Sequence, residues 1–197
     1  KIEKGRPRIT WKIASTMDGK VAAADGSSKW ITGELARADV AKIRAQADAI
    51  VTSTATVIAD DPLLTSKGLG KNPVRIVMGL SEIKGDSQIL GSDAETVLIK
   101  SHDFKELISM ANDRGFNQLL IESGPTLGTA LLREDLIDEI ILFQAPTLLG
   151  AGKPSIGDLG ISNISGRLDF DITDVEVIGA DLKITLVKSA KSTESGR

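Results

Sequence analysis

The sequence predicts an α/β fold with a mostly parallel central sheet, flanking helices and an antiparallel C-terminal hairpin. Short β-branched runs alternate with segments of helical periodicity along the 197 residues, a pattern typical of parallel strands joined by helices. The last two runs instead flank a short turn, as in a hairpin. Several runs end in polar clusters, and the carboxyl ends of parallel strands share one edge of a sheet, where ligands bind.

Length and composition indicate one ordinary globular domain. Apolar residues make up 41% and charged residues 26% of the chain, and no apolar run approaches the ~18 residues of a membrane span. The net charge of -3 and the scattered basic residues argue against nucleic acid as a partner. Because the chain has no cysteine and one histidine, thiolate chemistry is excluded and we expect no metal site.

The first strand is predicted over residues 9–15 and contains Lys12. A lysine in an otherwise apolar strand is either an edge residue whose amine reaches water or a site residue, and the pattern leaves both open. A shorter run, residues 21–24, precedes a polar turn. Thr32 is then the predicted N-cap of a helix, with Glu34 in the first turn favourable to the helix dipole. The apolar stripe of this helix is formed by Ala36, Val40, Ile43 and Ala47.

The stretch Ala49–Lys67 is the centre of the predicted site. It opens with a buried strand over residues 49–52, continues through hydroxyls able to cap a helix, and ends in the acidic turn Asp60-Asp61-Pro62. This order delivers polar groups to the C-terminal edge of a sheet. Arg44, just upstream and beside the helix stripe, is by its position typical of a solvated helix residue.

Further strands are predicted over residues 74–78, 96–99, 118–122 and 139–145, and the closing hairpin over residues 174–178 and 182–187. A helix begins near Phe104 and ends at Gly115. Residues 1–188 therefore form the predicted domain, and the polar residues 189–197 a disordered tail.

A glycine turn, residues 123–130, connects the strand that ends at Glu122 to the next helix. Amide N–H groups at such a helix start suit a phosphate, although glycine turns are common and this signal alone is weak. Glu122 at the same edge is either a structural acceptor or a ligand group.

In their order and spacing, the motifs of this chain resemble the reductase domain of the bacterial riboflavin-biosynthesis family RibD. The motifs are Lys12-(x)5-Asp18-Gly19-Lys20, Ser28 to Thr32, Arg44-Ala45-Gln46, Thr56 to Thr65, Glu122 to Leu127 and Ala145-Pro146-(x)2-Leu149-Gly150. With the final hairpin, the resemblance covers nearly the whole chain. It implies a dihydrofolate reductase-like fold and an NADPH-dependent oxidoreductase that converts 5-amino-6-(5-phosphoribosylamino)uracil to its ribitylamino product.

The resemblance also implies site residues. The cofactor contacts would be Ala14, Trp30, Thr56, Asp60, Gly124, Pro125, Thr126, Leu127, Gly128, Thr129 and Ala130. The substrate contacts would be Lys12, Ser28, Arg44, Leu64, Lys67 and Glu122. Lys12, Asp60 and Glu122 are the candidates for polarising the substrate and delivering protons, and the sequence does not choose among them. The family's Asp or Asn after the strand at 74–78 is replaced by Gly79-Leu80.

Two alternatives stay open at this point. One is a reductase of archaeal or fungal type that acts on the un-deaminated pyrimidine, and the other is a non-catalytic nucleotide-binding module. The deaminase zinc motif of RibD is missing here, so we expect the deaminase upstream in a longer polypeptide or on a separate chain. We also expect a cytoplasmic homodimer, for which residues 136–149 offer apolar surface unless they are core.

Overall fold

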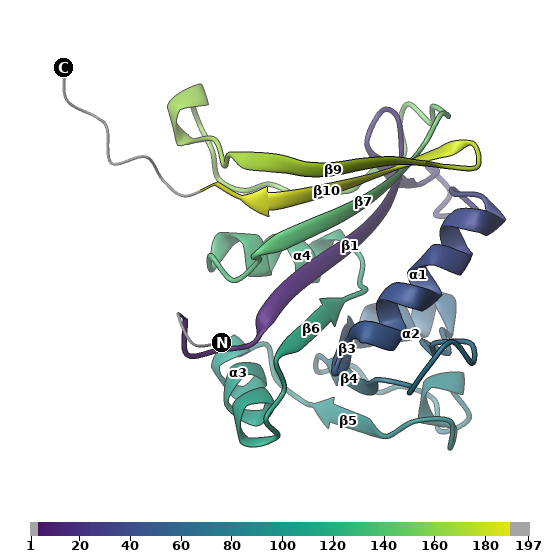
Figure 1. Ribbon diagram of the computed structural model, residues 1–197, viewed down its shortest axis with the longest axis vertical. Helices are drawn as coiled ribbons and strands as arrows, with labels where there is room; N and C mark the ends of the chain where they lie inside the picture. Colours follow the sequence, from purple (N-terminus) through teal and green to yellow (C-terminus); the bar gives the residue numbers. More distant parts are fainter. Residues whose placement is uncertain (1–3, 190–197) are drawn as a thin grey trace.

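The computed structural model describes residues 4–189, whose strands form an eight-stranded sheet and a small two-stranded one (Figure 1). The strand order of the large sheet is β5-β4-β3-β6-β1-β7-β10-β9. Its strands are β1 (Arg8–Thr16), β3 (Ala49–Ser53), β4 (Val74–Met78), β5 (Thr96–Ile99), β6 (Gln118–Ile121), β7 (Glu139–Ala145), β9 (Phe170–Ile178) and β10 (Asp181–Lys188). The pairs from β5 to β7 are parallel, and β10 is antiparallel to both neighbours, as predicted.

Helices cover both faces of the sheet (Figure 1). They are α1 (Glu34–Gln46), α2 (Thr54–Asp60), α3 (Phe104–Asp113) and α4 (Pro125–Arg133). Since alternate residues of a strand point to opposite faces, Ala49 and Val51 pack with α3 and α4, whereas Ile50 packs with α1 and α2. The predicted apolar stripe of α1 is confirmed, because all four of its residues are buried.

The start of α1 differs from the prediction. Its N-cap is Gly33, and the carboxylate of Asp181 at the start of β10 accepts the Gly33 N–H at 2.7 Å. The carbonyl of Thr32 instead accepts a hydrogen bond from Arg37. The prediction of Thr32 as the cap was wrong because a carboxylate from a distant strand satisfies the helix start, which no local pattern reveals.

The sequence pattern did not predict several short elements between the strands. β2 (Lys20–Ala22), expected as a short run, pairs with the unforeseen β8 (Lys153–Pro154), and 3-10 helices cover Gln88–Leu90 and Ile164–Gly166. The predicted tail lies outside the described residues except for Ser189. Across residues 4–189, no helix is long and apolar enough to cross a membrane.

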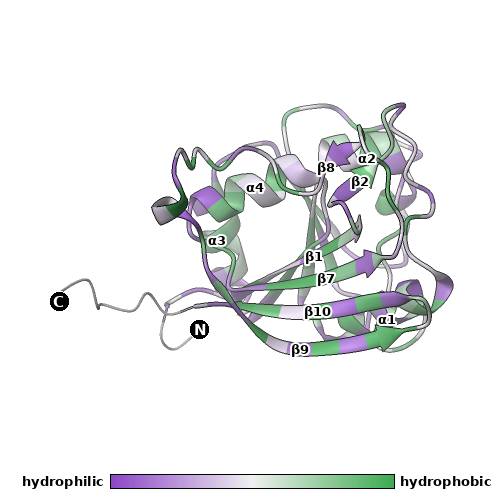
Figure 2. Cartoon of the chain, turned by 90° about the horizontal axis from the view of Figure 1, so that it is seen from above, coloured by the Kyte–Doolittle hydropathy of each residue, from purple (hydrophilic) through white to green (hydrophobic). Residues whose placement is uncertain are grey.

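The apolar residues 136–149 are mainly core, which is the second of the two readings left open. Ile137, Ile140 and Phe143 are buried, and Leu148 is exposed in the loop that follows β7. Exposed apolar side chains lie instead on the edge strand β9, which Figure 2 colours largely as hydrophobic.

Candidate active site

Lys12 and Glu122 meet where β1 and β6 lie side by side. β1 runs between β6 and β7, so Lys12 is in a central strand and the edge-strand interpretation was wrong. Its ammonium Nζ lies 3.8 Å from Oε2 of Glu122, which directly follows β6. The expectation that polar groups of neighbouring parallel strands meet at one edge of the sheet is confirmed for these two residues.

Arg44 completes this cluster from α1. Its Nε and Nη2 donate to the two carboxylate oxygens of Glu122 at 2.6 and 2.9 Å, a bidentate pair. The interpretation of Arg44 as a solvated helix residue was therefore wrong, since its side chain is 16% exposed. Lys12, Glu122 and Arg44 will be called the buried charge cluster.

Burial and mutual charge set the pKa values within the cluster. Burial acts to raise the pKa of Glu122, but the charge and hydrogen bonds of Arg44 and the charge of Lys12 outweigh it, so the pKa falls below its ordinary value. The pKa of Lys12 is lowered by burial and by the Arg44 charge, against the opposing effect of Glu122. At neutral pH, Glu122 is thus a carboxylate that only accepts hydrogen bonds, and Lys12 is a stronger acid than an ordinary lysine.

The segment Asp61–Lys67 follows α2 and contacts the cluster through its backbone. Nη1 of Arg44 donates to the Thr65 carbonyl at 3.2 Å. Asp61, Leu64 and Lys67 have φ values of 42°, 51° and 52°, the left-handed region that non-glycine residues rarely adopt. The Leu64 side chain is buried in the core beneath α1, so only its backbone could contact a ligand, whereas Lys67 is exposed.

The glycine turn begins α4 as predicted, with Gly124 as N-cap and Pro125 at the first helical position. The Gly124 N–H donates to Oγ1 of Thr56 at 3.2 Å, and the amide of Thr56 in turn donates to Ser53, the N-cap of α2. These bonds bring the starts of α2 and α4 together. No side chain caps α4, and a Cβ added at Gly124 would have Thr56 Oγ1, 4.0 Å away, as its nearest neighbour, so the space before the helix is open.

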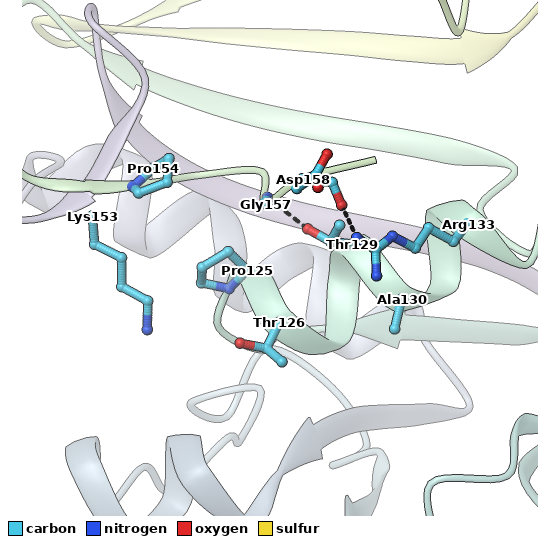
Figure 3. A pocket seen from close by; sticks show the side chains of 9 residues that line it. All are labelled: Pro125, Thr126, Thr129, Ala130, Arg133, Lys153, Pro154, Gly157 and Asp158. Carbon is cyan, nitrogen blue, oxygen red and sulfur yellow. Dashed lines mark hydrogen bonds between the residues drawn. The ribbon is translucent and has the colours of Figure 1, made fainter. Parts of the chain in front are cut away.

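Deeper in the same turn, Gly128 and Thr129 serve packing. A Cβ at Gly128 would lie 2.1 Å from the ring of Trp11, which means that α4 rests directly on this side chain. Thr129 accepts the Gly157 N–H at 2.8 Å (Figure 3). These two buried residues, which were predicted to contact the cofactor, therefore have a structural role in packing α4.

A pocket of about 310 Å³ lies on the side of α4 that faces β8 (Figure 3). Its lining residues are Pro125, Thr126, Thr129, Ala130, Arg133, Lys153, Pro154, Gly157 and Asp158. Four of them belong to the predicted glycine turn, and none belongs to the buried charge cluster.

Trp30 and Asp60 lie at the outer side of the site. The Trp30 side chain is 69% exposed, and the Arg37 guanidinium stacks 4.6 Å from its ring centroid. Lys29 donates to the backbone carbonyl of Asp60 at 3.2 Å. Among residues 4–189, no hydrogen bond or ion pair joins the exposed Asp60 carboxylate to Lys12 or Glu122, so the structure separates one predicted catalytic residue from the other two.

The remaining predicted site residues border the same edge. Ala14 is half-buried in β1 opposite Phe143, and Ser28 is half-buried in the loop before Trp30. The glycine at position 79 has a physical reason, because its φ is 133° and a Cβ would lie 2.4 Å from Thr54 Oγ1. An Asp or Asn at this position would be strained at this φ and would require the Thr54 side chain to move.

Comparisons with a family model and with curated proteins point to the same family. The chain matches the RibD C-terminal domain family over residues 7–184. It is 41% identical over 192 residues to the riboflavin biosynthesis protein RibD of Mycobacterium tuberculosis H37Rv, covering 95% of this chain and 56% of that relative. The chain thus spans about half the length of the curated relatives it matches.

Two solved structures share the fold closely. The chain is similar to Acinetobacter baumannii RibD, with a TM-score of 0.88 at 30% identity over 96% of this chain and 60% of that one. It is also similar to a diaminohydroxyphosphoribosylaminopyrimidine deaminase/5-amino-6-(5-phosphoribosylamino)uracil reductase of Thermotoga maritima, with a TM-score of 0.82 at 25% identity over 94% and 58%. The expected dihydrofolate reductase-like fold is confirmed.

Proposed function

The chain belongs to the RibD C-terminal domain family, and from that membership we propose that it reduces 5-amino-6-(5-phosphoribosylamino)uracil to its ribitylamino product with NADPH in riboflavin biosynthesis. The observation that carries the proposal is the buried charge cluster, which holds an acidic lysine at the ligand-binding edge of the sheet. Such a lysine suits a reduction that needs a proton on nitrogen.

Residues around α4 fit the cofactor. The uncapped start of α4 offers backbone N–H groups and a positive dipole to a diphosphate, and the space before Gly124 is open. Thr56 lies at this helix start, where it bonds the Gly124 N–H, and suits the ribose. The exposed ring of Trp30, at the outer side of the site, suits the nicotinamide. When bound, NADPH would supply the hydride that reduces ribose C1′.

Lys12 is the proposed proton donor. After the sugar opens, the C1′=N bond becomes a C–N single bond and its nitrogen must gain a proton, which the Lys12 ammonium gives up before water reprotonates the amine. Glu122 stays ionised, because Arg44 stabilises its charge, and it therefore keeps the lysine charged and oriented rather than donating itself. Asp60, exposed at the end of α2, is left with a contact role on the cofactor side.

Lys67 is the proposed principal partner of the substrate phosphate. Arg44 already uses three donor nitrogens on Glu122 and the Thr65 carbonyl, which limits what it can offer to a phosphate. Lys67 is exposed at the end of the segment that Arg44 contacts. The surplus positive charge of the cluster adds attraction without a direct bond.

The same proposal includes two partners. A deaminase that supplies the substrate is expected, because the similar T. maritima protein is named as both deaminase and reductase and this chain covers 58% of it. We also propose a homodimer through β9, where Ile172, Val175 and Val177 are 66%, 54% and 74% exposed at the sheet edge. Analytical ultracentrifugation tests the dimer, and a monomer at micromolar concentration would contradict it.

The test of the substrate is NADPH oxidation with the deaminated and un-deaminated pyrimidine phosphates side by side. Turnover of the deaminated compound alone supports the proposal. Turnover of only the un-deaminated compound would assign the archaeal or fungal order of steps instead. NADPH binding without turnover of either would indicate the non-catalytic module.

A further inference from the structure

Arg75 on β4 is a fully buried guanidinium held by oxygen atoms that carry no formal charge. Its Nε donates to Thr96 Oγ1 at 3.0 Å, and its Nη2 donates to the carbonyls of Gly91, at 2.6 Å, and Ala94. Of residues 4–189, none places a carboxylate within salt-bridge distance of it. Buried arginines are usually paired directly with a carboxylate. Here the Asp93 charge acts on Arg75 only from beyond salt-bridge distance, and burial still lowers the Arg75 pKa, so the direct contacts of the guanidinium are all to neutral oxygens.

The remaining hydrogen bond of Arg75 is made to the segment Asp61–Lys67. Its Nη1 donates to the carbonyl of Leu63 at 3.3 Å. Two residues later, Arg44 donates to the carbonyl of Thr65 at 3.2 Å. Arg44 precedes this segment in the sequence and Arg75 follows it. Together they hold the carbonyls of Leu63 and Thr65, the residues on either side of Leu64.

Leu64 is the residue that needs such restraint. Its φ of 51° is in the left-handed region, as are those of Asp61 and Lys67 in the same segment. A non-glycine residue stays in this region only when its surroundings fix it there. The Leu63 carbonyl belongs to the peptide unit directly before Leu64, so its bond to Arg75 restrains rotation about the Leu64 N–Cα bond. The Thr65 carbonyl belongs to the peptide unit after Thr65, so Arg44 holds the next step of the segment.

We propose that Arg75 is a positioning residue for the substrate: it fixes the left-handed conformation of Leu64 within residues 62–67, so that Lys67 and Arg44 present their charges to the substrate phosphate together. The inference rests on the proposed function for the identity of the ligand, but the restraint on the backbone does not. The residue touches no substrate itself, because its side chain is sealed beneath the segment.

The experiment compares Arg75→Lys with Arg6→Lys. Arg6 is the matched control, since it is also a buried arginine, but it pairs with Asp138 and lies beside the start of β1, away from the site. Lysine keeps the charge yet cannot span four acceptors on both sides of the strand. The thermal unfolding midpoint of both variants is measured, so that a general loss of stability can be told apart from a local effect on the segment.

Hydrogen exchange of the amides of residues 63–67, among them the Ser66 N–H that donates to Asn72 Oδ1 at 2.9 Å, is measured first, because it needs no substrate. We expect Arg75→Lys to speed this exchange about tenfold or more while the amides of β3 stay protected, and Arg6→Lys to leave the segment unchanged. We then expect KM for the phosphorylated pyrimidine to rise about tenfold, with kcat and KM for NADPH within about twofold.

Unchanged exchange in residues 63–67, or an unchanged KM for the pyrimidine in an active enzyme, would overturn the proposal. If the wild-type chain oxidises NADPH with neither pyrimidine, the proposed function fails, and the exchange measurement still decides whether Arg75 restrains the segment.

Discussion

Glu122 and Arg44 are 78 positions apart in the sequence, yet they form two parallel hydrogen bonds of 2.6 and 2.9 Å in the buried site. This pair keeps the carboxylate ionised and leaves Lys12, 3.8 Å away, as the group able to lose a proton. The chemistry we assign to the site depends on that division of roles.

Replacement of Lys12 should affect turnover. We expect Lys12→Ala to lower kcat by about a hundredfold or more, because the proton donor is lost. Lys105→Ala is the control, since Lys105 is exposed on α3. A Lys12→Ala enzyme with normal kcat would remove Lys12 from the mechanism.

The pH dependence of kcat should report the same lysine. Because the ammonium form is the donor and its pKa lies below the ordinary 10.5, kcat should fall with rising pH before 10.5 is reached. Glu122 raises the pKa of Lys12, so Glu122→Gln should move this alkaline limb to still lower pH. A limb that stays in place in Glu122→Gln would show that another group controls it.

Stability should also depend on Glu122. Removing one partner of a buried ion pair typically costs about 3 to 5 kcal/mol, so Glu122→Gln should lose this order of free energy of unfolding at pH 7. The folded pKa of Glu122 is below its ordinary 4.5, so the stabilisation is complete above pH 4.5 and is lost as pH falls through the folded pKa. The difference between variant and wild type should therefore narrow below pH 4.5.

Urea unfolding at several pH values measures this difference. Glu95→Gln is the control, because the Glu95–Arg114 pair is on the surface and should contribute at most about 1 kcal/mol. A Glu122→Gln penalty as small as that of Glu95→Gln would contradict the burial of the pair.

The phosphate role of Lys67 can be tested without disturbing the backbone. Asn tolerates left-handed φ values better than most residues, so Lys67→Asn removes the charge and keeps the conformation at φ 52°. We expect KM for the phosphorylated pyrimidine to rise about three- to tenfold with kcat little changed. Lys71→Asn, at an exposed lysine of the same loop, is the control, and an equal rise there would point to general electrostatic attraction.

Gly128 offers a test of the packing beneath α4. An alanine normally stabilises a helix relative to glycine, but here its Cβ would be 2.1 Å from Trp11. We expect Gly128→Ala to cost about 1 to 3 kcal/mol by overpacking, measured by urea unfolding. Gly85→Ala, where a Cβ meets nothing within 4 Å, should be neutral, and a stabilised Gly128→Ala would contradict the contact.

The strands and the meeting of Lys12 with Glu122 were predictable, because β-branched runs and parallel strand ends are local signals with one spatial consequence. The Glu122–Arg44 pair was not predictable, because helix periodicity places Arg44 beside the apolar stripe but does not show which residue its side chain contacts. Asp181 likewise reaches Gly33 across 148 positions. Asp60 was a catalytic candidate, but it is the exposed last residue of α2, and the sequence pattern does not say which way the end of a short helix faces.

The most direct test of the function follows the hydride. The chain is incubated with deuterium-labelled NADPH and the deaminated pyrimidine ribosylamine phosphate, and the product is analysed by mass spectrometry and NMR. We expect one deuterium at C1′ of a ribitylamino product, formed by wild type and lost in Lys12→Ala. Label that stays in the cofactor, or that enters the pyrimidine ring, would contradict the assignment of this chain as the reductase of the ribosyl group.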